Sequence, residues 1–182
     1  MQRDDSGNIL QYLNKSGPSI SYQWGYNAQY PVAQVTNAKF NDIFYDSFEE
    51  GNGNSTLDDS KTGHYSHTGT YSKALTGMDA GSYTLTYWQK SGSIWSLITT
   101  PVTVSGNAYT ISLNAQIDDI RIYPKDGQIT TYTYDPLVGM TSSTDAKGMT
   151  TTYEYDGFQR LMNVKDKDGN IVKHMDYHYQ GQ

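Results

Sequence analysis

The sequence predicts an all-β fold, and three features support this prediction. The 182 residues include 17 Tyr and 17 Gly, and the chain is also rich in Thr, Asn, Asp and Ser. Tyr and Thr favour strands, whereas Gly, Asn, Asp and Ser favour the turns between them. No segment carries apolar residues at the i, i+3, i+4, i+7 spacing of an amphipathic helix, and near the C-terminal end a short pattern occurs twice, 21 positions apart. We therefore predict a β-sandwich inserted into an array of β-hairpin repeats.

The repeated pattern has one landmark for a strand and one for a turn. Residues 132–135 read Tyr-Thr-Tyr-Asp and residues 153–156 read Tyr-Glu-Tyr-Asp, while residues 145–148 and 166–169 both read Asp-x-x-Gly. Tyr-x-Tyr places two rings on one face of a strand, because side chains alternate between faces. The following Asp156-Gly157 is a turn dipeptide in which Gly is free to take a positive φ. A fixed period in the twenties is typical of stacked supersecondary units, here β-hairpins.

The repeat also reaches both ends of the chain. Tyr177-His178-Tyr179 begins a further copy, 24 positions after Tyr153. At the other end, residues 4–9 match residues 166–171 at their Asp, Gly, Asn and Ile. We therefore predict that the chain begins inside a repeat, and that residues 1–40 and 127–182 pair in one sheet.

Between these segments the period is absent. Residues 41–126 contain seven predicted strands, at 42–49, 71–75, 82–90, 94–99, 102–104, 108–113 and 117–123. Short strands at this spacing, separated by turn residues, are typical of a two-sheet sandwich. The repeat resumes at Gly127, so we expect residues 41–126 to be an inserted domain whose two ends lie close together.

The repeat units resemble the YD repeats of Rhs proteins. The resemblance rests on Tyr-x-Tyr-Asp, on Asp-x-x-Gly, and on the elements Gln159-Arg160-Leu161 and Val138-Gly139-Met140 between them. A further segment, Trp-Gly-Tyr-Asn to Tyr-Pro-Val-Ala at residues 24–33, is similar to Rhs-type proteins of Bacteroidetes. Those proteins are very large, bacterial, and secreted or on the cell surface, and their repeats wind into a β-sheet shell around a toxin or other cargo. The resemblance implies a non-catalytic piece of a longer Rhs-type chain.

The inserted segment has a resemblance of its own, to jelly-roll carbohydrate-binding modules. Its landmarks occur in the same order, at residues 48–51, 69–72, 83–88 and 117–123. The resemblance implies a polysaccharide or cell-surface glycan as partner, and a structural Ca²⁺ held by Glu49 and by Asp118 or Asp119. If Ile120 and Ile122 point inward, alternation places Asp118 inward too. An inward carboxylate must be paired, hydrogen-bonded or metal-bound, and oxygen ligands suit Ca²⁺; the alternative is a carboxylate that caps a turn or accepts backbone N–H bonds.

A sugar-binding platform is predicted on the strand at residues 82–90. Leu85 and Tyr87 share one face, and Trp88 lies on the other, more polar face. A flat ring on a polar face suits stacking against a sugar, so we expect Trp88 to bind glycan with help from Trp95 or the neighbouring Tyr87. The alternative is that Trp88 or Trp95 is buried against the repeat array, since Trp is highly buried on average.

Other classes of function are disfavoured. A net charge of −6 argues against a nucleic-acid partner, and no apolar run approaches the ~18 residues of a membrane span. Neither a Gly-x-Ser-x-Gly elbow nor a phosphate-binding loop occurs, so no catalytic residue is predicted. The alternatives are a glycan-processing or autoproteolytic enzyme fragment, and a purely structural insert on a toxin-encapsulating shell.

Overall fold

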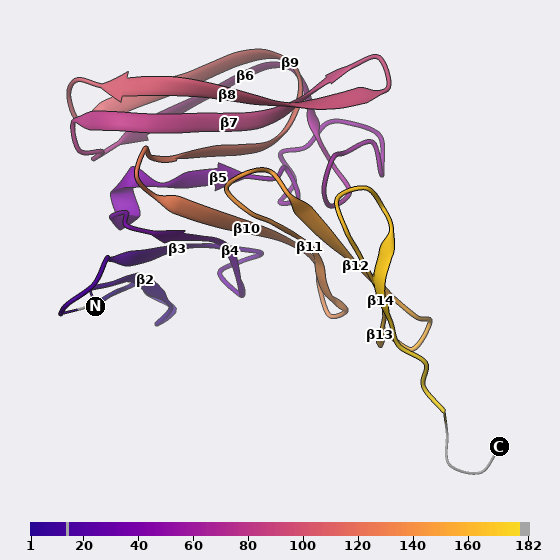
Figure 1. Cartoon of the computed structure of the whole chain (residues 1–182). Helices are drawn as coiled ribbons and strands as arrows, with labels where there is room; N and C mark the ends of the chain where they lie inside the picture. Colours follow the sequence, from indigo (N-terminus) through magenta and orange to yellow (C-terminus); the bar gives the residue numbers. More distant parts are fainter. Residues whose placement is uncertain (14, 179–182) are drawn as a thin grey trace.

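The computed structural model describes residues 1–13 and 15–178, and these residues form two antiparallel sheets (Figure 1). The nine-stranded sheet, called the repeat sheet below, contains β1 (Gln2–Arg3), β2 (Ile9–Tyr12), β3 (Ile20–Gly25), β4 (Tyr30–Thr36), β10 (Gln128–Asp135), β11 (Gly139–Thr144), β12 (Thr150–Tyr155), β13 (Leu161–Lys165) and β14 (Ile171–His174). The five-stranded sheet, called the sandwich sheet, contains β5 (Phe44–Asp46), β6 (His67–Thr76), β7 (Gly81–Ser91), β8 (Ile94–Val104) and β9 (Ala108–Pro124). A 3₁₀ turn, η1 (Phe40–Asp42), is the only helical element of the described residues. The all-β prediction is confirmed.

The repeat sheet runs without a break through both ends of the chain. Its strands follow one another in sequence order except at one point, where β4 pairs with β10. In this pair Thr36 lies opposite Gln128 and Ala33 opposite Thr131. The predicted pairing of the first and last segments is therefore confirmed. The whole sandwich sheet takes the place of a hairpin turn between β4 and β10, and the Asn37 side chain donates to the carbonyl of Asp126 at 3.3 Å across its base.

Four turns of the repeat sheet, at residues 4–8, 145–149, 156–160 and 166–170, share one geometry, which differs from the prediction in two respects. In residues 166–170 the Gly169 N–H donates to Asp166 O at 3.0 Å, and Gly169 has a φ of +84°. Residues 156–160 repeat this bonding, but the residue with positive φ is Gln159, at +62°, and not Gly157. The reason is that the left-handed position follows a type I turn, as in longer hairpin loops. The second difference is the position of the first turn. The turn at residues 4–8 has the same hydrogen bonds as the turn at residues 166–170. Because strand direction alternates across the sheet, the two turns lie at opposite ends of the strands.

The sandwich sheet folds over on itself around β9. Residues 108–117 of this strand pair with β6, whereas residues 116–124 pair with β7, and Asp119 at the bend has a φ of +50°. The first half of β9 and β6 thereby face β7 and β8, as Figure 1 shows. The core between them contains Phe48, Tyr71, Met78, Tyr83, Leu85, Val102, Val104, Ile111, Ile117, Ile120 and Ile122. The result is sandwich-like, with both layers drawn from one sheet.

Two pairs of predicted strands are continuous in the structure, and one predicted strand is shorter. Residues 94–99 and 102–104 join into β8, because Pro101 lies in an edge strand where a missing N–H is tolerated. Residues 108–113 and 117–123 join into β9. The strand predicted at residues 42–49 is reduced to β5, since Phe48 takes a φ of +62° that a strand does not allow.

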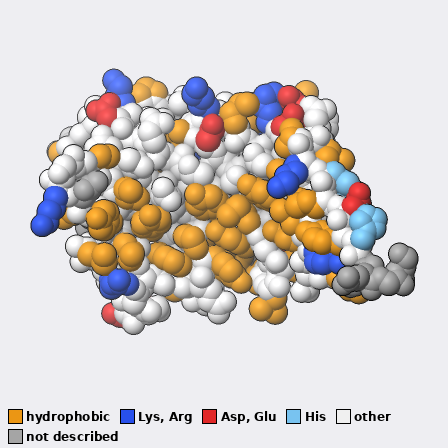
Figure 2. Space-filling view, turned by 60° about the horizontal axis from the view of Figure 1, so that its bottom comes forward, with side chains coloured by type: hydrophobic (Ala, Val, Ile, Leu, Met, Phe, Trp, Pro, Cys, Tyr) orange, Lys and Arg blue, Asp and Glu red, His pale blue; other side chains and the backbone are white. Residues whose placement is uncertain are grey.

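The two sheets are joined by buried apolar contacts. Val35 and Ile129 of the repeat sheet form a cluster with Ala38 and with Tyr123 of β9. Val32 and Ala33 form another with Tyr45 of β5. The opposite face of the repeat sheet is not covered: hydrophobic side chains gather in a band across it, with charged side chains at the margins (Figure 2). No helix of the described residues has the length and apolar character needed to cross a membrane.

Candidate functional site

Trp88 lies between the sandwich sheet and the repeat sheet. It stands opposite Leu97 on β8, and a Cβ added to Gly148 in the turn between β11 and β12 would lie 3.5 Å from its Cζ2 atom. On its ring face, Lys61 Nζ is 4.4 Å from the centroid, and the indole Nε1 is buried. The half-buried ring lies beside a turn of the repeat sheet, and its part in sugar binding stays a prediction.

The other two predicted sugar contacts are divided between the two faces of the sandwich sheet. Tyr87 is half-buried and packs on the core between the two layers. Trp95 is half-buried on the same face of the β7–β8 pair as Trp88, because it lies opposite Lys90, whose Nζ atom is 5.6 Å from the Trp95 ring centroid. The structure therefore places Trp88 and Trp95 on one face of the β7–β8 pair and Tyr87 on the other. Sugar binding stays a prediction, and Trp95 is the Trp farther from the Gly148 turn along β8.

Asp118 is held by backbone N–H groups. Its Oδ2 atom accepts from Lys61 N at 2.7 Å and from Thr62 N at 3.1 Å, and its Oδ1 atom accepts from Asp119 N at 2.7 Å. The bend in β9 places Asp118 opposite Trp88 and so on the face away from the core. This corrects the expectation that Asp118 shares the inward face with Ile120. Burial raises the pKa of Asp118 well above its ordinary 3.8, the charge of Asp119 acts in the same direction, and the three N–H donors act against both.

Asp119 belongs to a buried network that sequence reasoning missed. Its Oδ1 atom accepts from the Tyr45 hydroxyl at 2.6 Å, and its Oδ2 atom lies 3.3 Å from Arg121 Nη2. Arg121, which is 1% exposed, also donates from Nη1 to the Asp145 carbonyl at 2.9 Å. The network joins β5 and β9 to a turn of the repeat sheet. Residues 118–123 are buried on both faces of β9, so alternation could not separate an inner from an outer set.

The predicted Ca²⁺ ligands do not fit a cation in this arrangement. Glu49 Oε1 accepts from His64 N and Tyr65 N, each at 2.8 Å, and burial raises the pKa of Glu49. Asp118 and Asp119 are likewise engaged by N–H, O–H and guanidinium donors. These donors compete with a cation for the same oxygens. Among the residues that the structure describes, no three His, Asp or Glu side chains are placed to hold a metal ion.

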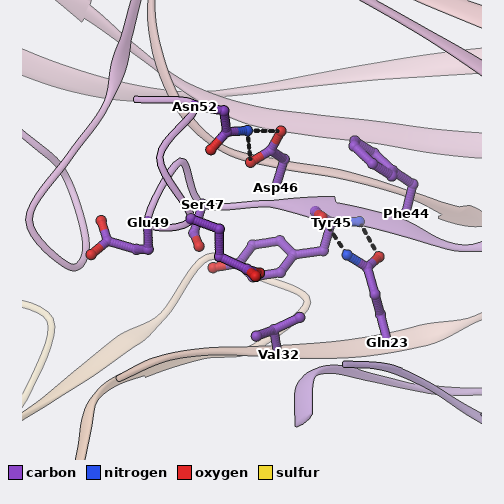
Figure 3. A pocket seen from close by; sticks show the side chains of 9 residues that line it. Gln23, Val32, Phe44, Tyr45, Asp46, Ser47, Glu49 and Asn52 are labelled. Atoms are coloured by element: carbon purple, nitrogen blue, oxygen red, sulfur yellow. Dashed lines mark hydrogen bonds between the residues drawn. The ribbon is translucent and has the colours of Figure 1, made fainter. Parts of the chain in front are cut away.

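Figure 3 shows a polar cavity of about 180 Å³ between β5 and the repeat sheet. The residues that line it are Gln23, Val32, Phe44, Tyr45, Asp46, Ser47, Glu49, Glu50 and Asn52. The Gln23 amide is fixed by donating to Tyr45 O at 2.6 Å and accepting from Tyr45 N at 2.8 Å. The Asp46 carboxylate accepts from the Asn52 side chain, at 2.8 and 2.9 Å. The lining offers hydrogen bonds and the negative charge of Asp46, Glu49 and Glu50.

A repeated hydrogen bond links neighbouring strands of the repeat sheet. In each case an aromatic side chain donates to a backbone carbonyl on the preceding strand. The bonds are Trp24 Nε1 to Ile9 O at 2.9 Å, Tyr134 OH to Pro31 O at 2.9 Å, Tyr155 OH to Met140 O at 2.9 Å and Tyr177 OH to Leu161 O at 2.8 Å. We call these four bonds the aromatic links. The first three fall on the second aromatic residue of a Tyr-x-Tyr or Tyr-x-Trp, whereas Tyr177 is the first residue of its Tyr-x-Tyr.

The aromatic links correct the predicted start of the last repeat. Leu161 lies 21 positions after Met140, so Tyr177 is the counterpart of Tyr155 and lies 22 positions after it. The sequence pattern placed Tyr177 as the counterpart of Tyr153. Tyr179, the other ring of that predicted pair, lies outside the described residues. The 21-residue period is kept by the backbone carbonyl groups that accept these bonds, such as those of Met140 and Leu161. No sequence motif identifies these carbonyl groups.

Comparison with known proteins agrees with this architecture. The fold and the aromatic links define an all-β repeat protein with a sandwich-like insertion. Residues 138–171, which span β11, β12, β13 and the first residue of β14, match the family described as RHS Repeat. No curated protein matches the chain. The match supports an Rhs or YD-repeat protein, a kind of structural repeat that occurs in cell-surface and secreted proteins.

Proposed function

We propose that this chain is a non-catalytic segment of a longer, bacterial Rhs-type protein, where it forms part of a continuous β-sheet wall. One observation carries the proposal: β4 pairs with β10 directly across the base of the inserted sandwich sheet. The wall is therefore continuous whether or not the insert is present. The RHS repeat at residues 138–171 supports a secreted or cell-surface location.

The sandwich sheet is attached to this wall as a fixed structural insert. Arg121 bonds to the Asp145 carbonyl, Trp88 packs near Gly148, and two apolar clusters are shared between the sheets. These contacts engage the side chains that a glycan-binding face would need. They favour an insert that decorates one face of a shell around cargo over a carbohydrate-binding module.

Hydrogen exchange on the whole chain tests the wall. We expect the amides of β4, β10 and β11 to exchange as slowly as those of β7 and β9, because one cooperative unit opens together. Fast exchange in β10 and β11, with slow exchange in β7 and β9, would show a flexible carrier for an independent domain.

The competing functions are tested on the same sample. Released sugars from a polysaccharide panel, or self-cleavage products on gels, would favour the enzyme alternative. Retention on a glycan affinity gel that is lost in Trp95→Ala would favour carbohydrate binding. We expect none of these results from a structural segment.

A further inference from the structure

β8 has a long free edge without charged residues; residues 108–115 of β9, which pair only with β6, form another. β8 pairs with β7 from Ile94 to Val104 and with no other strand of the described residues. All eleven of its residues are uncharged. Its outer edge therefore presents a long row of backbone N–H and C=O groups without a strand partner. Such an edge is a template for pairing with another chain.

The edges of β1, β5, β6 and β14 carry features that discourage pairing. β1 has two residues and β5 has three. β14 has four residues, including Lys173 and His174. β6 is long, but Lys73 lies in it and Gly69 has a φ of +97°, which breaks the regular strand geometry. Short length, charge and backbone irregularity are the usual protections of an edge, and β8 has only Pro101.

Pro101 defines which part of β8 is free to pair. Pro has no N–H to donate, so in a strand it sits where its nitrogen faces the free edge. Backbone groups alternate in direction along a strand. By this alternation, the N–H and C=O groups of Trp95, Leu97 and Thr99 face the free edge, and those of the residues between them face β7. Usable pairing therefore ends before Pro101.

We propose that β8 is a homodimer interface, in which residues 94–100 pair antiparallel with the same residues of a second copy about a two-fold axis at Leu97. This register places Trp95 opposite Thr99 of the second copy and Ile94 opposite its Thr100. A two-fold interface brings the same patch of both subunits together. An uncharged strand satisfies that requirement without like-charge repulsion, and Thr and Trp form favourable cross-strand pairs. The second copy also covers Trp95, and Ile94, which is 67% exposed in the single chain.

The test is a pair of charge variants that differ only in the sign of one residue. In Ile94→Lys/Thr100→Lys, the proposed register sets two pairs of like charges directly opposite each other, which is destabilising. In Ile94→Lys/Thr100→Glu the same positions carry opposite charges. Both sites are exposed, so both variants should keep the fold and the melting temperature of the original chain.

Sedimentation equilibrium over a wide concentration range gives the readout. We expect the original chain to dimerise, the Lys/Lys variant to dissociate about tenfold more readily, and the Lys/Glu variant to dimerise at least as well as the original. A chain that stays monomeric at every concentration overturns the proposal. Dimerisation that is equal in the two variants overturns it as well, because the interface then lies elsewhere.

Discussion

At the scale of single residues, backbone conformation in the turns is decided by loop length and not by the most evident dipeptide. Asp156-Gly157 has the sequence of a tight turn, yet the left-handed residue is Gln159, at the fourth position. In the equivalent turns that position is Gly7, Gly148 and Gly169. Strand pairing on either side fixes the length of the loop, and the length fixes which residue turns left-handed. A local sequence signal contains no information about that pairing.

This difference predicts opposite results for two Gly substitutions. An added Cβ meets no atom within 4 Å at either Gly157 or Gly169, so only the backbone distinguishes them. Gly169→Ala should lower the free energy of unfolding by about 1–2 kcal/mol, since a φ of +84° is unfavourable for Ala. Gly157→Ala should leave it unchanged or raise it by up to about 1 kcal/mol. Urea unfolding of both variants measures the two free energies of unfolding. Equal decreases in the two variants would contradict the assignment of the left-handed position.

The buried carboxyl of Asp118 predicts an unusual dependence of stability on pH. Burial raises the pKa of Asp118 in the folded chain above its ordinary 3.8. The folded state therefore binds this proton more tightly than the unfolded state does. The stabilisation from this group is complete below the unfolded pKa and is lost as pH rises through the folded pKa.

Asp118→Asn isolates this contribution. The free energy of unfolding of the original chain minus that of the variant should fall as pH rises from about 4 to 8, by at most ~1.4 kcal/mol per pH unit. Titrating groups that do not interact with Asp118 cancel in the difference, which therefore reports Asp118 together with the adjacent Asp119. Denaturant unfolding at a series of pH values measures it, and a difference that is constant or rises with pH would show that the N–H donors outweigh burial.

At the scale of strands, the repeat is held together by bonds that the sequence motif does not show. Tyr-x-Tyr predicts a strand with two rings on one face, and the strands are present. The role of the second ring, which donates to the neighbouring strand, depends on register between strands and so on the folded sheet. The same limit applies to β8 and β9, where turn-like residues inside a predicted loop continue the strand because neighbours on the sheet supply hydrogen bonds.

The aromatic links predict different effects for two neighbouring Tyr residues. The Tyr155 hydroxyl donates to Met140 O at 2.9 Å, whereas the Tyr153 hydroxyl makes only a longer contact of 3.3 Å with Ser143 Oγ. Tyr155→Phe should lower the free energy of unfolding by about 1 kcal/mol, the net value of a hydrogen bond. Tyr153→Phe should change it by less than about half as much. Chemical unfolding of the two variants in parallel measures both, and a larger loss in Tyr153→Phe would show that the links are incidental.

At the scale of the whole molecule, the sequence predicted the sheet but not the way the insert is fixed to it. The shared pattern at both ends of the chain was sufficient to predict that residues 1–40 and 127–182 share a sheet. The insert contacts the sheet through Arg121 and Tyr45, which Asp119 links to each other, and these three residues lie in segments without any repeat. These residues meet only because β9 is covered on both faces. The Trp88 platform was predicted from alternation along one strand, which contains no information about the repeat-sheet turn that lies beside the ring.

Coupling between the two sheets can be measured with one Trp in each. Trp24 lies in β3 of the repeat sheet and Trp95 in β8 of the sandwich sheet. One variant keeps only Trp24 and another keeps only Trp95, with Phe at the other two Trp positions. If the sheets form one cooperative unit, both fluorescence signals should report the same urea midpoint and slope.

Arg121→Met in both backgrounds then tests what couples them. Removing the guanidinium leaves Asp119 buried beside Tyr45 without its ion pair, so the free energy of unfolding should fall by about 3–5 kcal/mol. The loss should be equal at Trp24 and Trp95, although Arg121 belongs to the sandwich sheet alone. Adding Asp119→Asn should recover part of it, because the unpaired charge is removed. If the urea midpoint reported by Trp24 is unchanged while the midpoint reported by Trp95 falls, the two sheets unfold independently. The sandwich sheet is then a separate domain that the repeat sheet does not stabilise.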